Sequence, residues 1–411
     1  MQTRLALEFS GDAAAQEAAG IVGRCVHCGF CTATCPTYQL LGDELDGPRG
    51  RIYLMQQMLA GEAVSDATRL HLDRCLGCRA CETTCPSGVE YGRLLDTGRA
   101  LIERKAPRTA LSRWSRRMLA AFLTGPLFSP ALRFGQMLRP LLPPSLRSRV
   151  PRHHSRKDWP SGQHARRMLL LGGCVHDALS PGIHAATARV FDRVGITLMV
   201  APAAGCCGAI RHHLADPAGA LQDIRRNIDA WWPHVEAGAE AILSAASGCS
   251  AMLREYGHLL RGDPLYAGRA ARIAALVRDP AEVLPAFADR LKGLLAPTPP
   301  ERIAFHAPCS LQHGLRLRGT VEKLLRQLGA EPLPVADAPQ CCGSAGTYSV
   351  LQPALSAKLG EAKAAALGAA GPQRILSANV GCIVQLGAFT EIPVTHWLEW
   401  LDAQLDDGAG Q

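Results

Sequence analysis

The spacing of hydrophobic and polar positions predicts helices in the first hundred residues of the chain. A short helix should end near Gly23, and apolar residues recur at helical spacing over 52–59. A further helix is predicted at 65–73, where Ser65 can cap the first turn. Between the first two, the Gly- and Pro-containing segment 46–51 predicts a turn.

From residue 168 onward, short apolar runs alternate with helical patterns. We predict strands at 168–173, 196–201 and 240–244, with helices at 182–194 and 216–236. This order of strand, helix and strand is typical of βαβ units, in which the strands form a parallel sheet.

The same region also contains an internal repeat. In both copies 31 residues separate the first cysteine from a Cys-Cys-Gly triplet. Three pairs of segments correspond: 166–174 with 301–309, 205–208 with 340–343, and 245–249 with 377–382. The sequence therefore predicts two tandem βαβ-type cysteine-rich repeats.

Two cysteine runs lie in the helical first part. Each has the spacing C-x₂-C-x₂-C-x₃-C-P, the run that binds [4Fe–4S] clusters in bacterial-type ferredoxins. The first run contains Cys25, Cys28, Cys31 and Cys35, and the second contains Cys75, Cys78, Cys81 and Cys85.

In two-cluster ferredoxins the fourth cysteine of each run ligates the other cluster. This rule predicts one cluster on Cys25, Cys28, Cys31 and Cys85, and a second on Cys75, Cys78, Cys81 and Cys35. A zinc ribbon uses paired C-x₂-C units, so it fits a repeated quartet followed by proline less well.

Eight further cysteines follow predicted strands in the two repeats. They are Cys174, Cys206, Cys207 and Cys249 in the first copy, and Cys309, Cys341, Cys342 and Cys382 in the second. Open α/β sheets place their ligands at the carboxyl edge, so the four cysteines of each copy should meet in space. They should form either a further iron–sulfur cluster or a group of thiols without metal, and the vicinal pair makes a single tetrahedral zinc a poor fit.

Composition places these cysteines in a reducing compartment. The chain has sixteen cysteines among 411 residues, and no N-terminal segment resembles a secretory signal. No run of apolar residues is long enough to span a bilayer. We therefore expect a cytoplasmic protein.

Basic residues are concentrated in one segment. Residues 101–167 contain fifteen Lys and Arg but only two acids, a net charge of +13 in a chain whose total is +8. Aromatic and aliphatic residues are interleaved with these charges, so residues 104–167 are expected either to touch a membrane surface peripherally or to dock on a partner. A connector that packs on its own domains is the alternative, and no nucleic-acid-binding module accompanies the charge.

Together these patterns predict an α/β fold with an N-terminal α-helical ferredoxin domain. We expect four parts: residues 1–100 with two [4Fe–4S] clusters, the basic amphipathic connector 101–167, and cysteine-rich domains at 168–295 and 296–411.

Two ferredoxin quartets followed by two CCG cysteine-rich domains resemble the iron–sulfur subunits of flavin-linked 2-hydroxy-acid and glycerol-3-phosphate dehydrogenases. The first run and the turn that follows it, through Arg51, are most similar to the glycolate oxidase (glycolate dehydrogenase) iron–sulfur subunits. This resemblance implies an electron-transfer subunit that accepts electrons from FAD-containing partner subunits oxidising glycolate, and passes them towards a quinone.

The chain contains no Gly-x-Gly-x-x-Gly fingerprint after a strand, in keeping with a flavin on separate subunits. We therefore do not expect it to oxidise substrate alone, and we predict no catalytic residue. Two alternatives stay open: a subunit of a lactate or glycerol-3-phosphate dehydrogenase, and a heterodisulfide-reductase-like subunit. The single cysteines Cys249 and Cys382 favour electron transfer over disulfide chemistry, because some related domains have a second cysteine three residues earlier.

Overall fold

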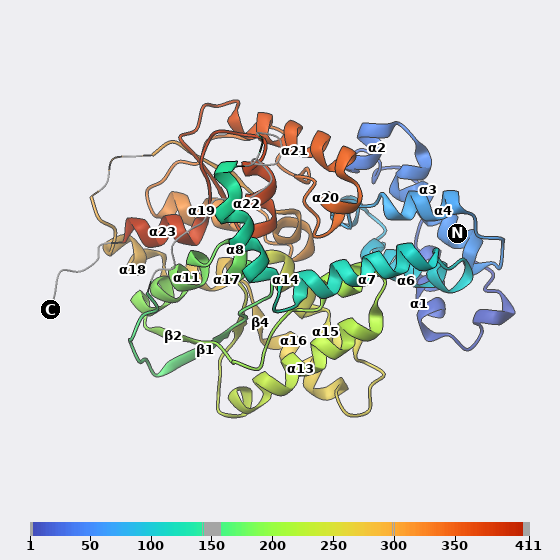
Figure 1. Cartoon of the computed structure of the whole chain (residues 1–411), viewed down its shortest axis with the longest axis horizontal. Helices are drawn as coiled ribbons and strands as arrows, with labels where there is room; N and C mark the ends of the chain where they lie inside the picture. Colours follow the sequence, from blue (N-terminus) through green and yellow to red (C-terminus); the bar gives the residue numbers. More distant parts are fainter. Residues whose placement is uncertain (1–2, 142, 144–157, 298, 300, 406–411) are drawn as a thin grey trace.

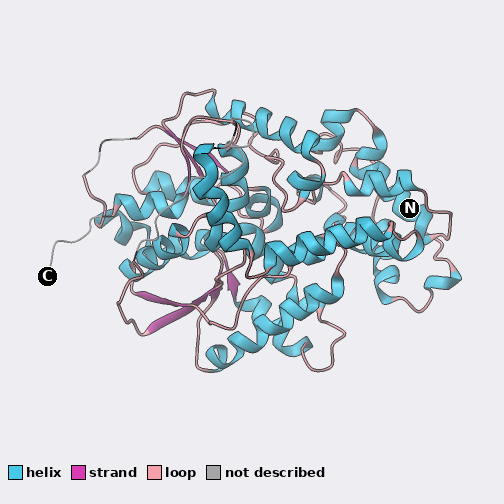
Figure 2. Cartoon of the chain, in the orientation of Figure 1, coloured by secondary structure: helices cyan, strands magenta, loops and turns pink. Residues whose placement is uncertain are grey.

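The computed structural model describes residues 3–141, 143, 158–297, 299 and 301–405. The N-terminal part is helical, whereas the remainder combines helices with two small parallel sheets (Figures 1 and 2). The predicted fold class, α/β with a helical N-terminal domain and two parallel-sheet repeats, is confirmed.

Short helices make up the N-terminal domain. They are η1 (Leu7–Phe9), α1 (Ala13–Gly23), α2 (Pro36–Leu41), η2 (Glu44–Asp46), α3 (Pro48–Leu59), α4 (Asp66–Asp73), α5 (Ala80–Thr84) and α6 (Tyr91–Lys105). The Ser65 hydroxyl accepts a bond of 3.3 Å from the amide of Thr68, which makes it the predicted cap of α4.

The turn predicted at 46–51 is wrong over most of its length. Gly47 is the N-cap of α3, and Pro48 is its first residue. Proline suits this position because its ring fixes a helical φ and the missing N–H has no partner in the first turn of a helix. A Pro-Gly-rich segment therefore starts a helix here.

Among the described residues, the N-terminal domain is followed by α7 (Ala110–Thr124), α8 (Phe128–Leu138) and η3 (Arg139–Leu141). Helices α7 and α8 cross the front of the molecule and link the N-terminal domain to the repeats (Figure 1). The boundary expected between residues 100 and 101 falls inside α6, and residues 142 and 144–157 of the expected connector lie outside the described residues.

The first repeat is built on a four-stranded parallel sheet of order β2-β1-β3-β4. Its strands are β1 (Arg166–Leu170), β2 (Ile196–Met199), β3 (Ile242–Leu243) and β4 (Val277–Arg278). Its helices are α10 (His176–Leu179), α11 (Gly182–Arg193), α12 (Ala209–His213), α13 (Pro217–Glu236), α14 (Ser247–Arg254), α15 (Tyr256–Leu259), α16 (Ala267–Leu276), α17 (Pro280–Val283), η4 (Leu284–Phe287) and α18 (Ala288–Gly293).

The second repeat has a three-stranded parallel sheet of order β5-β6-β7. Its strands are β5 (Ile303–His306), β6 (Arg374–Ser377) and β7 (Val394–His396). Its helical elements are η5 (Ser310–Gly314), α19 (Thr320–Gln327), α20 (Tyr348–Leu351), α21 (Pro353–Gly368), α22 (Val380–Gly387) and α23 (Trp397–Gln404).

One hydrophobic core joins the two repeats. Phe191 of α11 and Trp397 of α23 are both almost fully buried in the same cluster, which also contains residues of β1 and β5. Arg189 of α11 also forms a salt bridge of 2.5 Å with Asp402 of α23. The repeats therefore pack as one body, and a separate core is found in the N-terminal domain.

Candidate functional site

The two cysteine loops of the N-terminal domain have the same backbone shape. In each loop, the residues two and four positions after the first cysteine are left-handed: His27 and Gly29 in one, Gly77 and Arg79 in the other. A left-handed residue reverses the local direction of the chain, which lets three cysteines spaced three apart face one centre. His27 and Arg79 adopt this conformation although it is unfavourable for residues with a Cβ.

The first pocket collects the thiols that were predicted to share one cluster. Cys25, Cys28 and Cys31 line it together with Cys85 and Cys81 from the second run. Burial raises the pKa of the Cys31 thiol to about 11, with further contributions from the nearby thiols of Cys25, Cys28 and Cys85. The fourth cysteine of the second run thus lies with the first three of the other.

The second pocket has the reciprocal composition. Cys75, Cys78 and Cys81 line it together with Cys35. Burial raises the pKa of Cys81, and the neighbouring Cys78, Cys75 and Cys35 thiols raise it further. Cys85 and Cys35 thus each lie with the first three cysteines of the other run, and Cys81 borders both pockets. This donor set fits two cubane clusters, since each needs four convergent thiolates.

Arg51 lies buried beside the second pocket, with 1% of its surface exposed. Its guanidinium donates to the His71 carbonyl at 2.7 Å, contacts the Asp46 carboxylate at 3.2 Å and approaches the Cys35 sulfur at 4.0 Å. Burial alone would lower the pKa of Arg51, but the Cys75, Tyr91, Cys35 and Asp46 groups outweigh it and raise that pKa. Arg51, which ends the segment predicted as a turn, is held inside the protein by a buried carboxylate and the thiols.

The second pocket also receives two donors on the sulfur of Cys75. The Tyr91 hydroxyl lies 3.7 Å from that sulfur, and the Gly77 amide donates to it at 3.5 Å. Tyr91 is 3% exposed and lines both pockets. These donors stabilise an anionic sulfur and shield it from water.

The thiols of the first repeat are close neighbours. Cys206 is hydrogen-bonded to both Cys174 and Cys207, and Cys207 in turn to Cys249. The Cys174 contact lowers the pKa of Cys206 and raises that of Cys174, so Cys206 is the preferred thiolate of this pair. All four predicted positions of this copy are thus brought together.

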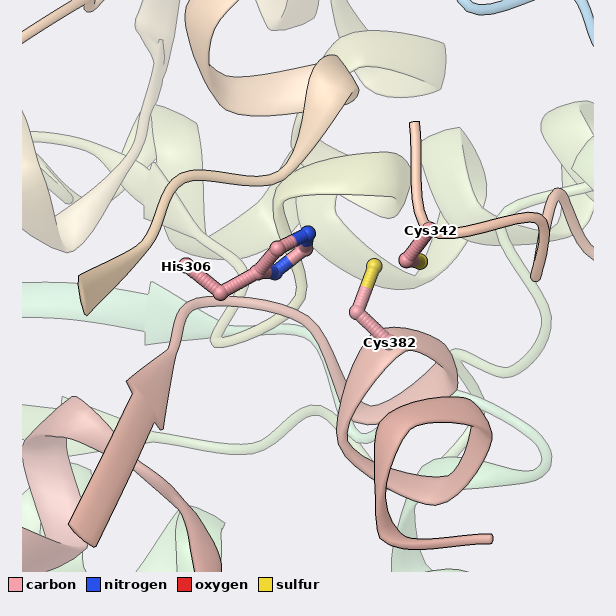
Figure 3. A group of neighbouring side chains, drawn as sticks. All are labelled: His306, Cys342 and Cys382. Carbon is pink, nitrogen blue, oxygen red and sulfur yellow. The ribbon is translucent and has the colours of Figure 1, made fainter. Parts of the chain in front are cut away.

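The cysteines of the second repeat are arranged in the same way, and the imidazole of His306 lies beside them. The sulfurs of Cys309 and Cys341 are 3.9 Å apart, and Cys342 is hydrogen-bonded to Cys341 and Cys382. In addition, ligand atoms of His306, Cys342 and Cys382 all lie within 4.8 Å of one another (Figure 3).

The backbone conformation explains why glycine follows the two cysteines in each Cys-Cys-Gly triplet. Gly208 and Gly343 are left-handed, and their amides each donate at 3.4 Å to the sulfur of the first cysteine in the pair. A Cβ on Gly343 would come within 2.6 Å of the carbonyl oxygen of Ser356 in α21. Only glycine combines this backbone shape with such a close approach to a helix.

The second pocket of the N-terminal domain lies next to the second repeat. The Cys309 thiol raises the pKa of Cys78 after burial, and Cys78 has the same effect on Cys341. Thr83 of α5 is hydrogen-bonded to Nδ1 of His313 at 2.8 Å, which ties the two parts together beside these thiols.

Sequence reasoning missed two residues that surround the thiols, Tyr91 and His306, and it did not predict the buried contacts of Arg51. Arg51 and Tyr91 carry no local signal, because their contacts join segments far apart in the chain. His306 could have been found from the repeat itself. Aligning 166–174 with 301–309 places a histidine opposite Leu171, three residues before the cysteine.

An apolar stripe lies along the outside of α7. Leu111, Trp114, Met118 and Phe122 are 74%, 61%, 49% and 42% exposed, at the i, i+3, i+7 spacing of one helix face. Within the described ranges, none of the helices combines the length and hydropathy that crossing a membrane requires.

Comparison with known families matches both halves of the chain. Residues 21–89 match the 4Fe-4S dicluster domain, and residues 168–254 and 303–387 match the cysteine-rich domain known as CCG. These three matches contain all sixteen cysteines of the chain.

Similar proteins extend over most of the sequence. The glycolate oxidase iron-sulfur subunit of Escherichia coli is 48% identical over 99% of this chain and 100% of its own length. The probable glycolate oxidase iron-sulfur subunit of Bacillus subtilis is 33% identical over 88% of this chain and 87% of its own. Lactate utilization protein A of Geobacillus thermodenitrificans is 28% identical over 54% of this chain and 90% of its own. With its dicluster and CCG domains in the same chain, this protein belongs to the family of glycolate oxidase iron–sulfur subunits.

Proposed function

We propose that this chain is the electron-transfer subunit of a flavin-dependent glycolate dehydrogenase complex. Partner subunits would oxidise glycolate to glyoxylate, and this chain would carry the electrons towards a quinone. The observation that carries the proposal is the pair of pockets, in each of which the last thiol of one cysteine run lies with the first three thiols of the other. The substrate follows from the relatives, two of which are named as glycolate oxidase subunits.

Eight thiolates would hold two [4Fe–4S] clusters in the N-terminal domain: Cys25, Cys28, Cys31 and Cys85 in one set, and Cys75, Cys78, Cys81 and Cys35 in the other. When bound, such clusters supply one-electron transfer at a potential set by charge, hydrogen bonds and exposure. The protein supplies the surroundings. Arg51 offers a buried positive charge, and Tyr91 and the Gly77 amide donate to Cys75.

The two pockets differ in their access to solvent, and this difference suggests the direction of electron transfer through the chain. Cys28 is exposed at the first pocket, and the neighbouring Val26 and Phe30 are 68% and 62% exposed. The second pocket faces the second repeat through Cys78. We therefore assign the flavoprotein contact to the edge that carries Val26 and Phe30, where electrons would enter.

Substrate oxidation is assigned to the partners, which would carry FAD. No dinucleotide fingerprint follows a strand in this sequence, so hydride chemistry has no evident place in the chain. Lactate is the second candidate substrate because of the lactate utilization relatives, but these cover only about half of this chain.

We further propose that α7 and α8 rest on the cytoplasmic face of the membrane, where a quinone acceptor would be found. The apolar stripe of α7 is flanked by the exposed Arg113 and Arg117, and Arg133 is exposed on α8. A helix with an apolar face bordered by cations binds anionic lipid surfaces. None of the sixteen cysteines, all of which lie among the described residues, is paired in a disulfide, and this supports the proposed cytoplasmic location.

Affinity purification of the full chain from its native host tests the subunit assignment. Flavin-containing polypeptides should co-purify, and the complex should reduce an artificial dye with glycolate faster than with lactate. A Phe30→Asp variant should lose the flavoproteins, whereas Leu265→Asp, at a side chain that is 80% exposed on the first repeat, should retain them. Glycolate turnover by the flavin-free chain would contradict the assignment.

A further inference from the structure

The imidazole of His306 lies among the four cysteines of the second repeat, and one of its ring nitrogens has no hydrogen-bond partner among the described residues. His306 ends β5 and is 1% exposed. Its Nδ1 is hydrogen-bonded to the Ser377 hydroxyl at 2.9 Å. Its Nε2 is buried without a hydrogen-bond partner among the described residues. A buried polar atom without a partner is costly, so this nitrogen needs an explanation.

The first repeat lacks this feature. The residue that corresponds to His306 is Leu171, which is 1% exposed and part of a hydrophobic core cluster. The four cysteines of the first repeat are otherwise arranged like the four of the second, and in each repeat a glycine amide, from Gly208 or Gly343, donates a hydrogen bond to a cysteine sulfur. The imidazole is therefore a specific difference between two similar sites.

A buried cation accompanies the imidazole. Lys363 of α21 is 3% exposed, and its ammonium donates to the carbonyls of Asp337 and Ala338 at 2.9 and 3.0 Å. Burial lowers the pKa of Lys363, while the thiols of Cys342 and Cys341 work in the opposite direction. A charged lysine at this depth is favourable only beside an anionic group. A thiolate-ligated metal centre supplies one.

We propose that the second repeat binds an iron–sulfur centre through five protein ligands: the thiolates of Cys309, Cys341, Cys342 and Cys382, and Nε2 of His306. The contacts among these groups place all five donors around one region. A vicinal cysteine pair cannot place both sulfurs on one tetrahedral ion without strain, which favours a centre with several irons over a single zinc.

The hydrogen bond between Nδ1 of His306 and the Ser377 hydroxyl suits a ligand, because a proton on Nδ1 that is donated to Ser377 leaves Nε2 able to bind a metal. Histidines that bind metals use their other ring nitrogen in a bond that fixes the ring orientation, and Ser377 does this for His306. Mixed histidine and cysteine ligation raises the potential of iron–sulfur centres above that of all-cysteine ones. The proposed centre also adjoins Cys78, so it would receive electrons from the second pocket whatever the substrate of the complex is.

Pulsed EPR on the full chain, purified anaerobically with ¹⁵N-labelled histidine, tests the ligand. The wild-type protein should show a histidine-nitrogen coupling to a reduced centre. That coupling should be lost in His306→Leu, which copies the first repeat, and in His306→Cys. The Cys variant should keep the iron and sulfide content of the wild type, because it replaces one ligand by another. A coupling that is absent in the wild type, or unchanged in both variants, overturns the proposal.

Metal analysis provides an independent readout. Cys342→Ser should lower the iron content and abolish the histidine coupling, whereas Cys207→Ser, the matched change in the first repeat, should leave the coupling intact. Retained signals from the two ferredoxin-type centres show that a variant has folded. Zinc in place of iron in the second repeat would also overturn the proposal. None of these outcomes depends on glycolate activity.

Discussion

At the scale of single residues, Arg51 balances the charge of the second cluster pocket. Its guanidinium lies between the buried Asp46 carboxylate and the Cys35 sulfur. Asp46 is itself 0% exposed and also bonds Arg74 at 2.8 Å. Because a buried charge without its partner is strongly destabilising, this network fixes both the fold of the domain and the charge that a bound cluster would meet.

Replacing Arg51 by methionine should therefore destabilise the N-terminal domain by about 3–5 kcal/mol, since Asp46 loses a buried partner. Arg49→Met is the matched control: its salt bridge to Glu44 is 38% and 40% exposed, so about 1 kcal/mol or less is expected. Chemical denaturation monitored by cluster absorbance measures both. Equal effects of the two variants would argue against the role given to Arg51.

If the ligand sets are crossed, replacing one cysteine should damage the cluster of the other cysteine run. Cys85→Ser should damage the centre of Cys25, Cys28 and Cys31, although Cys85 belongs to the other run, because its sulfur lies in their pocket. Mössbauer or EPR spectra of this variant, compared with those of Cys35→Ser, separate the two centres. Loss of the Cys75 centre in Cys85→Ser would mean that each run ligates its own cluster.

At the scale of elements, the sequence predicted those helices whose position depends on residues close together in the chain. The helix expected at 216–236 is found as α13, Pro217–Glu236, because its apolar spacing and the Asp216 cap are both readable in sequence. The grouping of the first eight cysteines was predicted from their spacing, and that of the other eight from their positions after strands. The turn at 46–51 failed because Pro48 starts a helix as readily as it ends one. Arg51 could not be placed, since its partner His71 lies twenty residues away.

The packing of the basic connector could not be predicted from its sequence. Arg108 and Arg116 are not free cations: both form salt bridges with Asp73, at 2.7 and 3.3 Å. Ala120 is buried, whereas Trp114 and Phe122 on α7 remain exposed. One face of the connector therefore packs on the protein, and another is left for a partner or a membrane.

The membrane proposal makes a prediction about three exposed cations. Changing Arg113, Arg117 and Arg133 to glutamine should weaken binding to anionic vesicles by about 3 kcal/mol at low salt, or roughly 100-fold, since each cation contributes about 1 kcal/mol. The same change at Arg272, Arg290 and Arg318, which are exposed elsewhere, is the control with equal charge. Vesicle co-sedimentation measures both variants.

Two outcomes would contradict this prediction. If both triple variants lose binding equally, net charge alone is responsible and α7 is no specific contact. If the connector variant stays on vesicles but loses its flavoprotein partners, the stripe is a protein-docking surface.

At the scale of the whole molecule, the chain forms a connected series of thiol sites. The first pocket opens to solvent at Cys28, the second adjoins Cys309 and Cys341 through Cys78, and both repeats share one core. A rigid body with neighbouring centres suits electron transfer, because the distance between the centres stays fixed. The shared core could not be predicted from the repeat pattern, which suggests two independent domains.

The central claim is that electrons from glycolate reach this chain only through flavoprotein partners. EPR spectra of the chain, recorded after anaerobic mixing with glycolate, test it most directly. Reduced iron–sulfur signals should develop when the purified flavoprotein subunits are present, and should be absent when the chain is mixed with glycolate alone. Signals that develop without the flavoproteins, or that fail to develop in the complete complex, would contradict the account.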